Sequence, residues 1–461
     1  MSTRIKQADI PEYVYLELKD HLWRQLIKVT IGDHVLKGSL LVEGEQALHA
    51  STSGTITDIT QHPSCHRNAV STTHLVIHSD GLDKWCNNID TRDPLTLAPK
   101  QIEEKIRLAG ITGLGGGGFP SASKLRAARQ NTPKHLIINA IECEPDINAD
   151  EAIMQAAPLE ILQAALATMR SLTLECCILA IADDKPAAIE IFQNAISKLD
   201  LGKQIKLVVV KALFPNGAER QLIEILLDIR LAHNTYPTQY GITCLNVSTL
   251  YAIYQAVFKN RALVERVLTL RTKAGTQNIR VHLGTPAHVL FNITSNEGGS
   301  LQVQRGGPLT GWLQPGAASV EKGTTGLRWP PPAKALNIVA CIRCAKCADI
   351  CPEHLLPQEL LWYSRPLNII KLNALTLSAC LECGLCESVC PSHIPLTNRF
   401  RDSKDAMLEI NEVAEHAQNA SIRVERRQRR IANSGNKVQS QRELRLNKLK
   451  RKNLSVKEHN S

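Results

Sequence analysis

The sequence contains no long apolar run. No stretch of its 461 residues reaches the roughly 18 consecutive apolar residues that a membrane-spanning helix needs. The first residues also lack the apolar core of a secretory signal peptide. We therefore expect a cytoplasmic chain without a membrane span. With 43% hydrophobic and 21% charged residues the chain can bury sizeable cores, and its length predicts about three domains.

Outside one C-terminal segment, the sequence has no net charge. Residues 423–452 hold twelve lysines and arginines against Glu425 and Glu443, which accounts for the whole net charge of +10. This segment has no aromatic residue, so it lacks the stacking surface that proteins use to bind single-stranded nucleic acid. We expect no nucleic-acid partner. Two interpretations remain: solubilisation, or attraction to anionic lipid worth about 1 kcal/mol per basic residue near a membrane.

Stretches of different pattern follow one another along the chain. Residues 26–60 alternate apolar and polar positions between glycine turns, which predicts a small β-structure. From about residue 103 to 262, short apolar strands alternate with helical segments, which predicts a mostly parallel sheet covered by helices. Residues 278–326 return to short strands. Beyond about residue 401 the sequence is polar and charged, which predicts an exposed helix or disorder.

The cysteines are unevenly placed. Eight of the fourteen fall within fifty residues, in the segments CIRCAKCADICP and CLECGLCESVCP. Both have the spacing Cys-x2-Cys-x2-Cys-x3-Cys-Pro, which is typical of two-cluster ferredoxins, where the fourth cysteine of each motif binds the cluster of the other motif. Zinc sites bring two cysteines per loop with a long spacer between the loops. Four cysteines in eleven residues therefore argue against zinc.

This spacing predicts two [4Fe-4S] clusters with exchanged fourth ligands. The expected ligands of cluster 1 are Cys341, Cys344, Cys347 and Cys390. The expected ligands of cluster 2 are Cys380, Cys383, Cys386 and Cys351.

A glycine-rich loop, GITGLGGGGFPSASKL, occupies residues 110–125. It lets backbone amides approach a phosphate, a helix expected to begin near Ser121 adds the positive end of its dipole, and Lys124 adds a full charge. A flexible turn would use the same glycines, so the loop alone leaves phosphate binding open. The candidate glycines are Gly113, Gly115, Gly116, Gly117 and Gly118.

The next predicted strand ends in NAIECEPDINADEA. This places five polar residues at the carboxyl end of a sheet, where α/β proteins form ligand sites: Asn139, Glu142, Glu144, Asp146 and Asp150. Carboxylates there could accept hydrogen bonds from a ribose or a flavin ring. The alternative is a solvated acidic loop.

These motifs together resemble a known family. GITGLGGGGFPSASKL and NAIECEP resemble the flavin- and nucleotide-binding fingerprints of the NADH-binding subunit of respiratory NADH dehydrogenase. The RnfC/RsxC family, which belongs to the Rnf/Rsx ion-translocating electron-transport complex, shares them. The tandem ferredoxin motif, FPNGAERQLI (214–223) and QRGGPLTG (304–311) make the RnfC/RsxC family the closer match. The resemblance covers about residues 20–425.

The resemblance implies a multidomain α/β fold. Its expected parts are a lipoyl-like β hybrid domain (1–75), a Rossmann-like FMN/NADH-binding domain (100–262), a β-grasp insert of the soluble-ligand-binding type (263–329), a helical ferredoxin-like domain with two [4Fe-4S] clusters (335–400) and a basic C-terminal tail (401–461).

The resemblance also implies a function. NADH passes a hydride to FMN, which is held by the glycine loop, Lys124 and Asn139, while Glu142 and Glu144 help to position the nucleotide. FMN converts the two electrons of the hydride into single electrons for the clusters, and the cofactors carry the redox chemistry. The expected protein is a peripheral oxidoreductase subunit of an ion-translocating complex, on the cytoplasmic face of the bacterial inner membrane. Its expected partners are the other subunits, NADH and, in the reverse direction, ferredoxin.

Several positions depart from the family pattern. The start lacks a Gly-Gly-x-His-Pro segment, Ala140 replaces a glycine, Asn216 replaces a glutamine, and Leu309-Thr310 replace two methionines. The alternative function is therefore a cluster-bearing relay or docking subunit with an empty nucleotide site. A third interpretation, the NADH-oxidising subunit of a soluble hydrogenase or formate dehydrogenase, is disfavoured by FPNGAERQLI and by the hybrid-like N-terminus. No residue is assigned a catalytic role.

Overall fold

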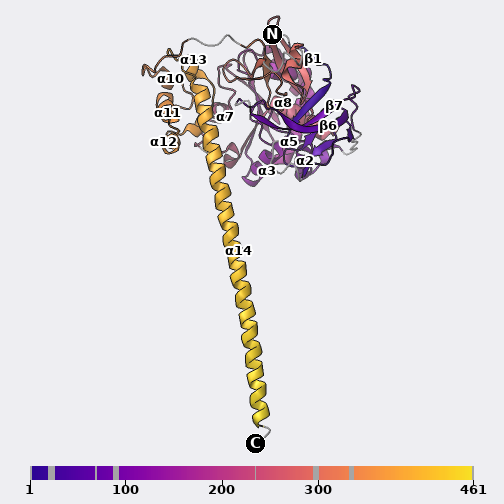
Figure 1. The fold of residues 1–461 in the computed structure, drawn as a ribbon. Helices are drawn as coiled ribbons and strands as arrows, with labels where there is room; N and C mark the ends of the chain where they lie inside the picture. Colours follow the sequence, from indigo (N-terminus) through magenta and orange to yellow (C-terminus); the bar gives the residue numbers. More distant parts are fainter. Residues whose placement is uncertain are drawn as a thin grey trace. The chain divides into compact units, whose positions relative to one another are not determined.

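The computed structural model describes residues 3–18, 26–67, 70–86, 93–233, 235–293, 301–331 and 337–458. Figure 1 shows the chain as a ribbon. It divides into two compact units, each described by itself below. Unit 1 comprises Met1–Leu356 and Ala379–Ile394, and unit 2 comprises Pro357–Ser378 and Pro395–Ser461.

Unit 1 begins with a small antiparallel β-structure, as the alternating pattern of residues 26–60 predicts. Its four-stranded sheet has the order β2-β7-β6-β3, and β4 and β5, which come between β3 and β6 in the chain, form a separate short hairpin. Alternate side chains of β2, Val14 and Leu16, are buried together with Leu75 and Ile77 of β7. The strands are β2 (Tyr13–Glu17), β3 (His34–Val35), β4 (Leu40–Val42), β5 (Leu48–His49), β6 (Gly54–Pro63) and β7 (Ser71–Ser79).

The centre of unit 1 is a parallel sheet with the order β10-β9-β8-β11, which confirms the predicted α/β region. Both faces are covered, because Leu136 and Ile138 join one core while Ile137 joins another with Leu222 and Ile223 of helix α7. The strands are β8 (His135–Ala140), β9 (Cys177–Ala182), β10 (Ile205–Val210) and β11 (Ile242–Asn246). The helices are α2 (Pro99–Leu108), α3 (Ser121–Gln130), α4 (Ala149–Ala156), α5 (Pro158–Leu172), α6 (Pro186–Lys198), α7 (Glu219–Leu227) and α8 (Val247–Lys259), with 3-10 turns η1 (Pro94–Thr96) and η2 (Pro237–Tyr240).

A six-stranded mixed sheet follows, with the order β1-β13-β12-β16-β14-β15. It contains the short strands expected over residues 278–326. The first strand of the chain also belongs to it, since β1 pairs with β13 in parallel. The assignment of this region as a β-grasp insert stays a prediction. The strands are β1 (Ile5–Gln7), β12 (Glu265–Thr272), β13 (Gly275–His282), β14 (Gln302–Arg305), β15 (Trp312–Pro315) and β16 (Gly326–Arg328), with the turn η3 (Ala287–Phe291).

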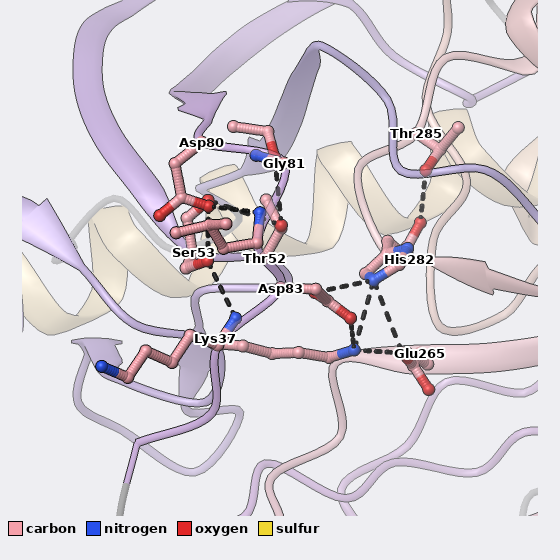
Figure 2. A network of polar contacts seen from close by, with 12 residues as sticks. Lys37, Thr52, Ser53, Asp80, Gly81, Asp83, Glu265, His282 and Thr285 are labelled. Atoms are coloured by element: carbon pink, nitrogen blue, oxygen red, sulfur yellow. Dashed lines mark hydrogen bonds and ion pairs between the residues drawn. The ribbon is translucent and has the colours of Figure 1, made fainter.

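A buried ion cluster connects the first β-structure to the six-stranded sheet (Figure 2). Lys37, only 2% exposed, donates from Nζ to Asp83 Oδ2 at 2.5 Å and to Glu265. His282 Nε2 lies 3.0 Å from Asp83 Oδ1. Burial raises the pKa of Asp83, but the hydrogen bonds from His282 and Lys37 outweigh burial and lower this pKa to about 2. These charges compensate one another only while the two β-structures stay together.

Within the described residues, no single helix has the length and apolar character needed to cross a membrane. Helices α4 and α5, bent by 93° at their junction, meet those two criteria only when they are taken together.

Unit 2 is helical. It contains α11 (Pro357–Ser364), α12 (Ile369–Ala374) and α14 (Leu396–Glu458). The first turns of α14 bury Leu396 and Phe400, and from Leu408 onward its described apolar side chains are exposed. The sequence left open whether this segment is an exposed helix or disordered. The structure has a single helix of 63 residues here, buried at its first turns (Figure 1). At 1.5 Å per residue it is about 95 Å long.

Candidate functional site

The order of the central sheet defines where a ligand site forms. The chain reverses direction across the sheet between β8 and β11, and α/β proteins bind ligands at such a switch point, beyond the carboxyl ends of the strands. Asn139 near the end of β8 is the register partner of Asn246 at the end of β11. We call the glycine loop 113–118, residues 139–142 and residues 246–248 the switch-point edge.

The glycine loop forms one side of the switch-point edge. Gly113 N–H donates to Phe119 O at 2.8 Å, and Leu114 N–H donates to Thr249 Oγ1 at 2.9 Å, which fixes the loop on helix α8. A Cβ added to Gly116, Gly117 or Gly118 would meet nothing within 4 Å. Helix α3 begins at Ser121, as predicted. The loop therefore presents bare backbone to open space.

A cleft lies beside this loop. Gly116 and Gly118 line it, and so do charged side chains of both signs: Arg305, Lys322, Glu17 and Glu321. The open space beside the glycines therefore has both basic and acidic groups around it.

Lys124 and Asn139 make internal hydrogen bonds. Lys124 Nζ donates to Glu219 Oε1 at 2.6 Å and to Cys244 O at 2.7 Å. Asn139 Nδ2 donates to Gly217 O at 2.8 Å, and its Oδ1 accepts from Ile141 N–H at 3.0 Å. Both side chains thus join the FPNGAERQLI segment to the edge of the sheet.

Glu142 caps helix α4. Its two carboxyl oxygens accept from the N–H groups of Asp150 at 3.0 Å and Glu151 at 3.1 Å. The side chain is buried, and burial together with the charge of Asp150 raises the pKa of Glu142. The switch-point edge therefore holds a carboxyl group that resists ionisation.

The sequence interpretation named Asp150 but missed the side chains that surround it next to Glu142. Asp150 accepts from Asn246 Nδ2 at 2.6 Å and from Ser248 Oγ. Burial lowers the pKa of nearby Arg266 to about 9, although the charge of Asp150 opposes this. Arg266 had a visible signal, since it is a charged residue within the apolar run LVERVLTL. Asn246 and Ser248 had none, because only the fold brings them to Asp150.

Glu144 points to a different part of unit 1. Its Oε1 accepts from the N–H groups of Leu309 at 2.8 Å and Thr310 at 3.1 Å. A Cβ on Gly307 would lie 2.1 Å from Glu144 Cγ, so a side chain there would push the Glu144 side chain away from the turn. Glu144, one of the predicted nucleotide-binding residues, therefore contacts the 307–311 turn of the six-stranded sheet through its side chain.

The two cysteine motifs repeat one backbone conformation. Arg343 (φ 58°) and Ala345 (φ 61°) in the first motif correspond to Glu382 (φ 55°) and Gly384 (φ 78°) in the second. Residues of left-handed conformation within a tight loop turn backbone N–H groups toward a common centre, and such nests occur at many iron–sulfur sites. Each loop leads into a four-residue helix, α10 (Lys346–Asp349) or α13 (Leu385–Ser388), and η4 (Leu377–Ala379) precedes the second loop.

The cysteine thiols fall into two groups. Burial and then the charges of Cys341, Cys344 and Cys390 raise the pKa of Cys347. Burial and then the charges of Cys380, Cys383 and Cys351 raise the pKa of Cys386, with Cys347 acting more weakly. Backbone N–H groups also donate to cysteine sulfur, from Leu355 to Cys351 and from Glu382 to Cys380, both at 3.4 Å. Cys347 thus interacts with Cys390 of the other motif, and Cys386 with Cys351, which is what an exchange of fourth ligands predicts.

One group of side chains outside the cysteine region has the spacing of a metal site. Ligand atoms of Asp83, Glu265 and His282 all lie within 4.8 Å of one another. Lys37 Nζ hydrogen-bonds within that group and lies 3.2 Å from His282 Nε2. The Lys37 ammonium therefore already supplies a positive charge to these carboxylates.

Comparison with known proteins assigns three parts of the chain. Residues 1–82 match the RnfC barrel sandwich hybrid domain, residues 106–255 match the Nuo51 FMN-binding domain, and residues 340–394 match a 4Fe-4S dicluster domain. These matches confirm the barrel-sandwich, flavin-binding and ferredoxin-type parts of the predicted fold. The exact boundaries of the five expected domains stay a prediction.

Relatives along most of the chain carry one name, the C subunit of the ion-translocating oxidoreductase complex. The protein of this name from Pectobacterium atrosepticum is 37% identical over 444 residues, covering 93% of this chain and 63% of the relative. That of Haemophilus influenzae (strain PittEE) is 38% identical over 435 residues, covering 90% and 65%. The chain belongs to this family, the RnfC family of ion-translocating oxidoreductase complexes. It spans less than two thirds of the length of these relatives.

Among solved structures, the chain is similar to the NAD+-reducing [NiFe]-hydrogenase in its H2-reduced state. That comparison covers 69% of this chain and 62% of the other, at 18% identity and a TM-score of 0.46.

Proposed function

We propose that this protein is an electron-transfer subunit that passes electrons between NAD(H), FMN and two [4Fe-4S] clusters. The observation that carries the proposal is the combination, in unit 1, of a bare glycine loop at a sheet switch point with two sets of four cysteines. Neither feature alone requires the other. An enzyme that passes electrons from a two-electron donor to one-electron carriers needs both features in one chain.

The switch-point edge fits a flavin nucleotide. Open space beside Gly116–Gly118 lets backbone N–H groups approach a phosphate, and helix α3 adds its positive end. Asn246, the N-cap residue of α8, lies against the loop, with its Cβ 3.3 Å from a Cβ placed on Gly115. Bound FMN would supply the change from two-electron to one-electron chemistry.

The chain's own residues have three tasks at this edge. The glycine loop binds and orients the nucleotide through its backbone. Lys124 and Asn139 hold the 215–219 segment against the sheet through the contacts with Glu219 and Gly217. Glu142, by capping α4, keeps Asp150 in position to hold Asn246 and Ser248. In this proposal Lys124, Asn139, Glu142 and Glu144 support the site, and the loop makes the closest approach.

The cysteine region fits two cubane clusters. The ligands of cluster 1 would be Cys341, Cys344, Cys347 and Cys390, and those of cluster 2 Cys380, Cys383, Cys386 and Cys351. The interactions of Cys347 with Cys390 and of Cys386 with Cys351, together with the repeated left-handed turns, support this assignment. Each cluster would carry one electron at a time.

The family name supports a place for this protein in a membrane complex. We propose that the other subunits of an ion-translocating oxidoreductase are its partners, on the cytoplasmic face of the inner membrane, and that NADH and ferredoxin are its redox partners. The basic segment 423–452 would attach it to anionic lipid.

The alternative is a cluster-bearing relay with an empty nucleotide site. Ala140 favours it, because this side chain stands where the family has glycine. However, Ala140 is completely buried in the core of the sheet. Its methyl group therefore faces packed side chains, which favours the flavin-binding function.

Cofactor analysis of the anaerobically reconstituted protein separates the two. We expect about eight irons per chain, one flavin, and reduction of an artificial acceptor by NADH. If the protein holds eight irons but no flavin after reconstitution with FMN, the relay is the function that remains. About four irons, or stoichiometric zinc, would remove the two-cluster function altogether.

A further inference from the structure

The two cysteine motifs share a backbone but differ in their surroundings. In the first motif, residues 342–346 are all exposed, and the side chain of Ile342 is 65% exposed. In the second motif, Gly384 is buried and its neighbours are half-buried. Because the loops have the same conformation, the difference comes from what packs against the second one.

The 307–311 turn of the six-stranded sheet packs against the second motif. A Cβ placed on Gly384 would lie 2.5 Å from Leu309 O, so this contact requires glycine. The equivalent residue of the first motif is Ala345, which is exposed and keeps a Cβ at the same left-handed position. Glycine thus stands in the motif that meets the 307–311 turn.

Glu144 fixes the other side of that turn. Its carboxylate binds the N–H groups of Leu309 and Thr310, and it lies four residues beyond β8. A short path therefore leads from the end of β8 through Glu144 and Leu309 to Gly384, the residue after Cys383.

A second contact, from helix α7, reaches the same set of cysteines. Gln221 Nε2 donates to Glu353 Oε1 at 3.0 Å and to Pro352 O at 3.4 Å, directly beyond Cys351. Glu353 is only 7% exposed. The equivalent residue after Cys390 is Ser392, whose Oγ donates to Ala340 O within the cysteine region.

Both contacts belong to the same set of ligands, because the fourth cysteines are exchanged. Gly384 adjoins Cys383, and Glu353 follows Cys351 by two residues. We propose that cluster 2 is the one next to the nucleotide-binding domain, that cluster 1 faces outward, and that Glu144 is the positioning residue that holds cluster 2's loop to that domain. This inference rests on the proposed function, and it adds the order of the two clusters.

The order gives the electrons a direction. Oxidation of NADH would give NAD+, a proton and two electrons, which would leave the nucleotide-binding domain one at a time. Cluster 2 would receive each electron, and cluster 1 would pass it to a one-electron acceptor in the complex. In the reverse direction, a reduced one-electron donor would deliver electrons at cluster 1, and two of them with one proton would regenerate NADH from NAD+.

The first test locates Glu144 by its charge. Glu144→Gln keeps an oxygen for the Leu309 and Thr310 N–H groups and removes one negative charge. In an EPR-monitored redox titration with dithionite, we expect the midpoint of one cluster signal to rise and the other to stay. Asp349→Asn, on α10 of the first motif, is the matched control and should raise the other signal. If both variants move the same signal, or Glu144→Gln moves neither, the proposal is overturned.

The second test measures access to each cluster. A chelator of ferrous iron, added to the dithionite-reduced wild-type protein, should remove the outward cluster first. The EPR signal that survives longer should be the one that Glu144→Gln shifts. Faster loss of that signal would place cluster 2 outward and refute the order.

Both tests are independent of nucleotide chemistry, so they separate two kinds of failure. If the protein binds no flavin, the proposed NADH oxidation fails while the titration and the chelation still report the order of the clusters. If flavin and both clusters are present but the order is reversed, the proposed function stands and only this inference fails.

Discussion

The cysteine region takes its eight proposed ligands from two segments of eleven residues, Cys341–Cys351 and Cys380–Cys390. The switch-point edge takes its groups from segments between Gly113 and Ser248, which meet only when the sheet has formed. The first site depends on local spacing, and the second depends on tertiary packing. We therefore expect substitutions in the cysteine region to act on one cluster, and substitutions at the switch-point edge to act on nucleotide binding without affecting iron.

The largest expected effect is the loss of one cluster. Cys351→Ser and Cys390→Ser should each lower the iron content from about eight to about four per chain. With the proposed exchange of fourth ligands, Cys351→Ser should remove cluster 2, and Cys390→Ser should remove cluster 1.

The surviving signal identifies the cluster that was lost. After Cys351→Ser, the remaining EPR signal should still respond to Lys346→Glu, a charge change in the first loop. After Cys390→Ser, it should not respond. The opposite pattern would mean that each motif holds its own fourth ligand.

The next effect concerns the glycine loop. Gly117→Val fills open space without backbone strain, whereas Gly116→Val also places a side chain at φ +104°. Crowding of about 1–3 kcal/mol corresponds to flavin binding weakened by about 5- to 150-fold, with Gly116→Val the more severe. Flavin titration and NADH oxidation measure this, while iron should stay at its wild-type level.

A matched control keeps this test specific. Gly202 also has open space around a Cβ and an ordinary φ, and it lies in the connection between α6 and β10. Gly202→Val should leave flavin, iron and turnover unchanged. Unchanged flavin binding in Gly117→Val would show that the glycine loop is only a turn.

A smaller effect is expected from the capping carboxyl. Glu142 has a folded-state pKa above its ordinary value of 4.5, so the unfolded chain loses this proton first as pH rises. The stability that protonated Glu142 contributes is fully present below pH 4.5, and it falls as the pH rises above this value. Glu142→Gln cannot ionise, and it can accept only one of the two N–H bonds, at a cost of about 1 kcal/mol.

Urea midpoints at acidic and alkaline pH check this prediction. The variant should unfold earlier than the wild type at acidic pH, and the gap should narrow toward alkaline pH. A gap that widens with pH would show that the carboxylate is stabilised in the folded protein.

The smallest effect is a difference between the two cysteine loops. The first carries Arg343 and Lys346, and the second carries Glu382 with Glu387 beside it. Positive charge favours the reduced cluster, so we predict that cluster 1 has the higher midpoint and that Lys346→Glu lowers it. A titration giving the opposite order would mean that hydrogen bonds to sulfur or solvent exposure outweigh charge.

The same contrast explains how much the sequence could predict. The parallel sheet, the start of α3 at Ser121 and the two cysteine motifs depend on patterns within a few residues, and these are confirmed as structural elements. The partners of Lys124 and Glu144 could not be predicted. Glu219 lies 95 residues from Lys124, and Leu309 lies 165 residues from Glu144, so only the folded sheet brings them together.

Sequence spacing also left the surroundings of the cysteine loops open. It predicts equal roles for Ala345 and Gly384, because both follow the second cysteine of a motif. What separates them is the approach of Leu309 O to Gly384, a contact made by a turn of the six-stranded sheet. Similarly, the ion cluster around Lys37 has no local signal, since its four residues come from separate strands and loops.

The repeated backbone of the two cysteine motifs has a consequence for symmetry. An internal duplicate with identical halves would have no distinguishable ends, and an electron would find the same environment from either side. Here a few side chains, Arg343 against Glu382 and Glu353 against Ser392, make the halves unequal while every ligand keeps its counterpart 39 residues away. The polarity of this element is therefore set by what surrounds the cysteines, namely the charges of each loop and the turn that packs on Gly384, and not by the cysteines themselves.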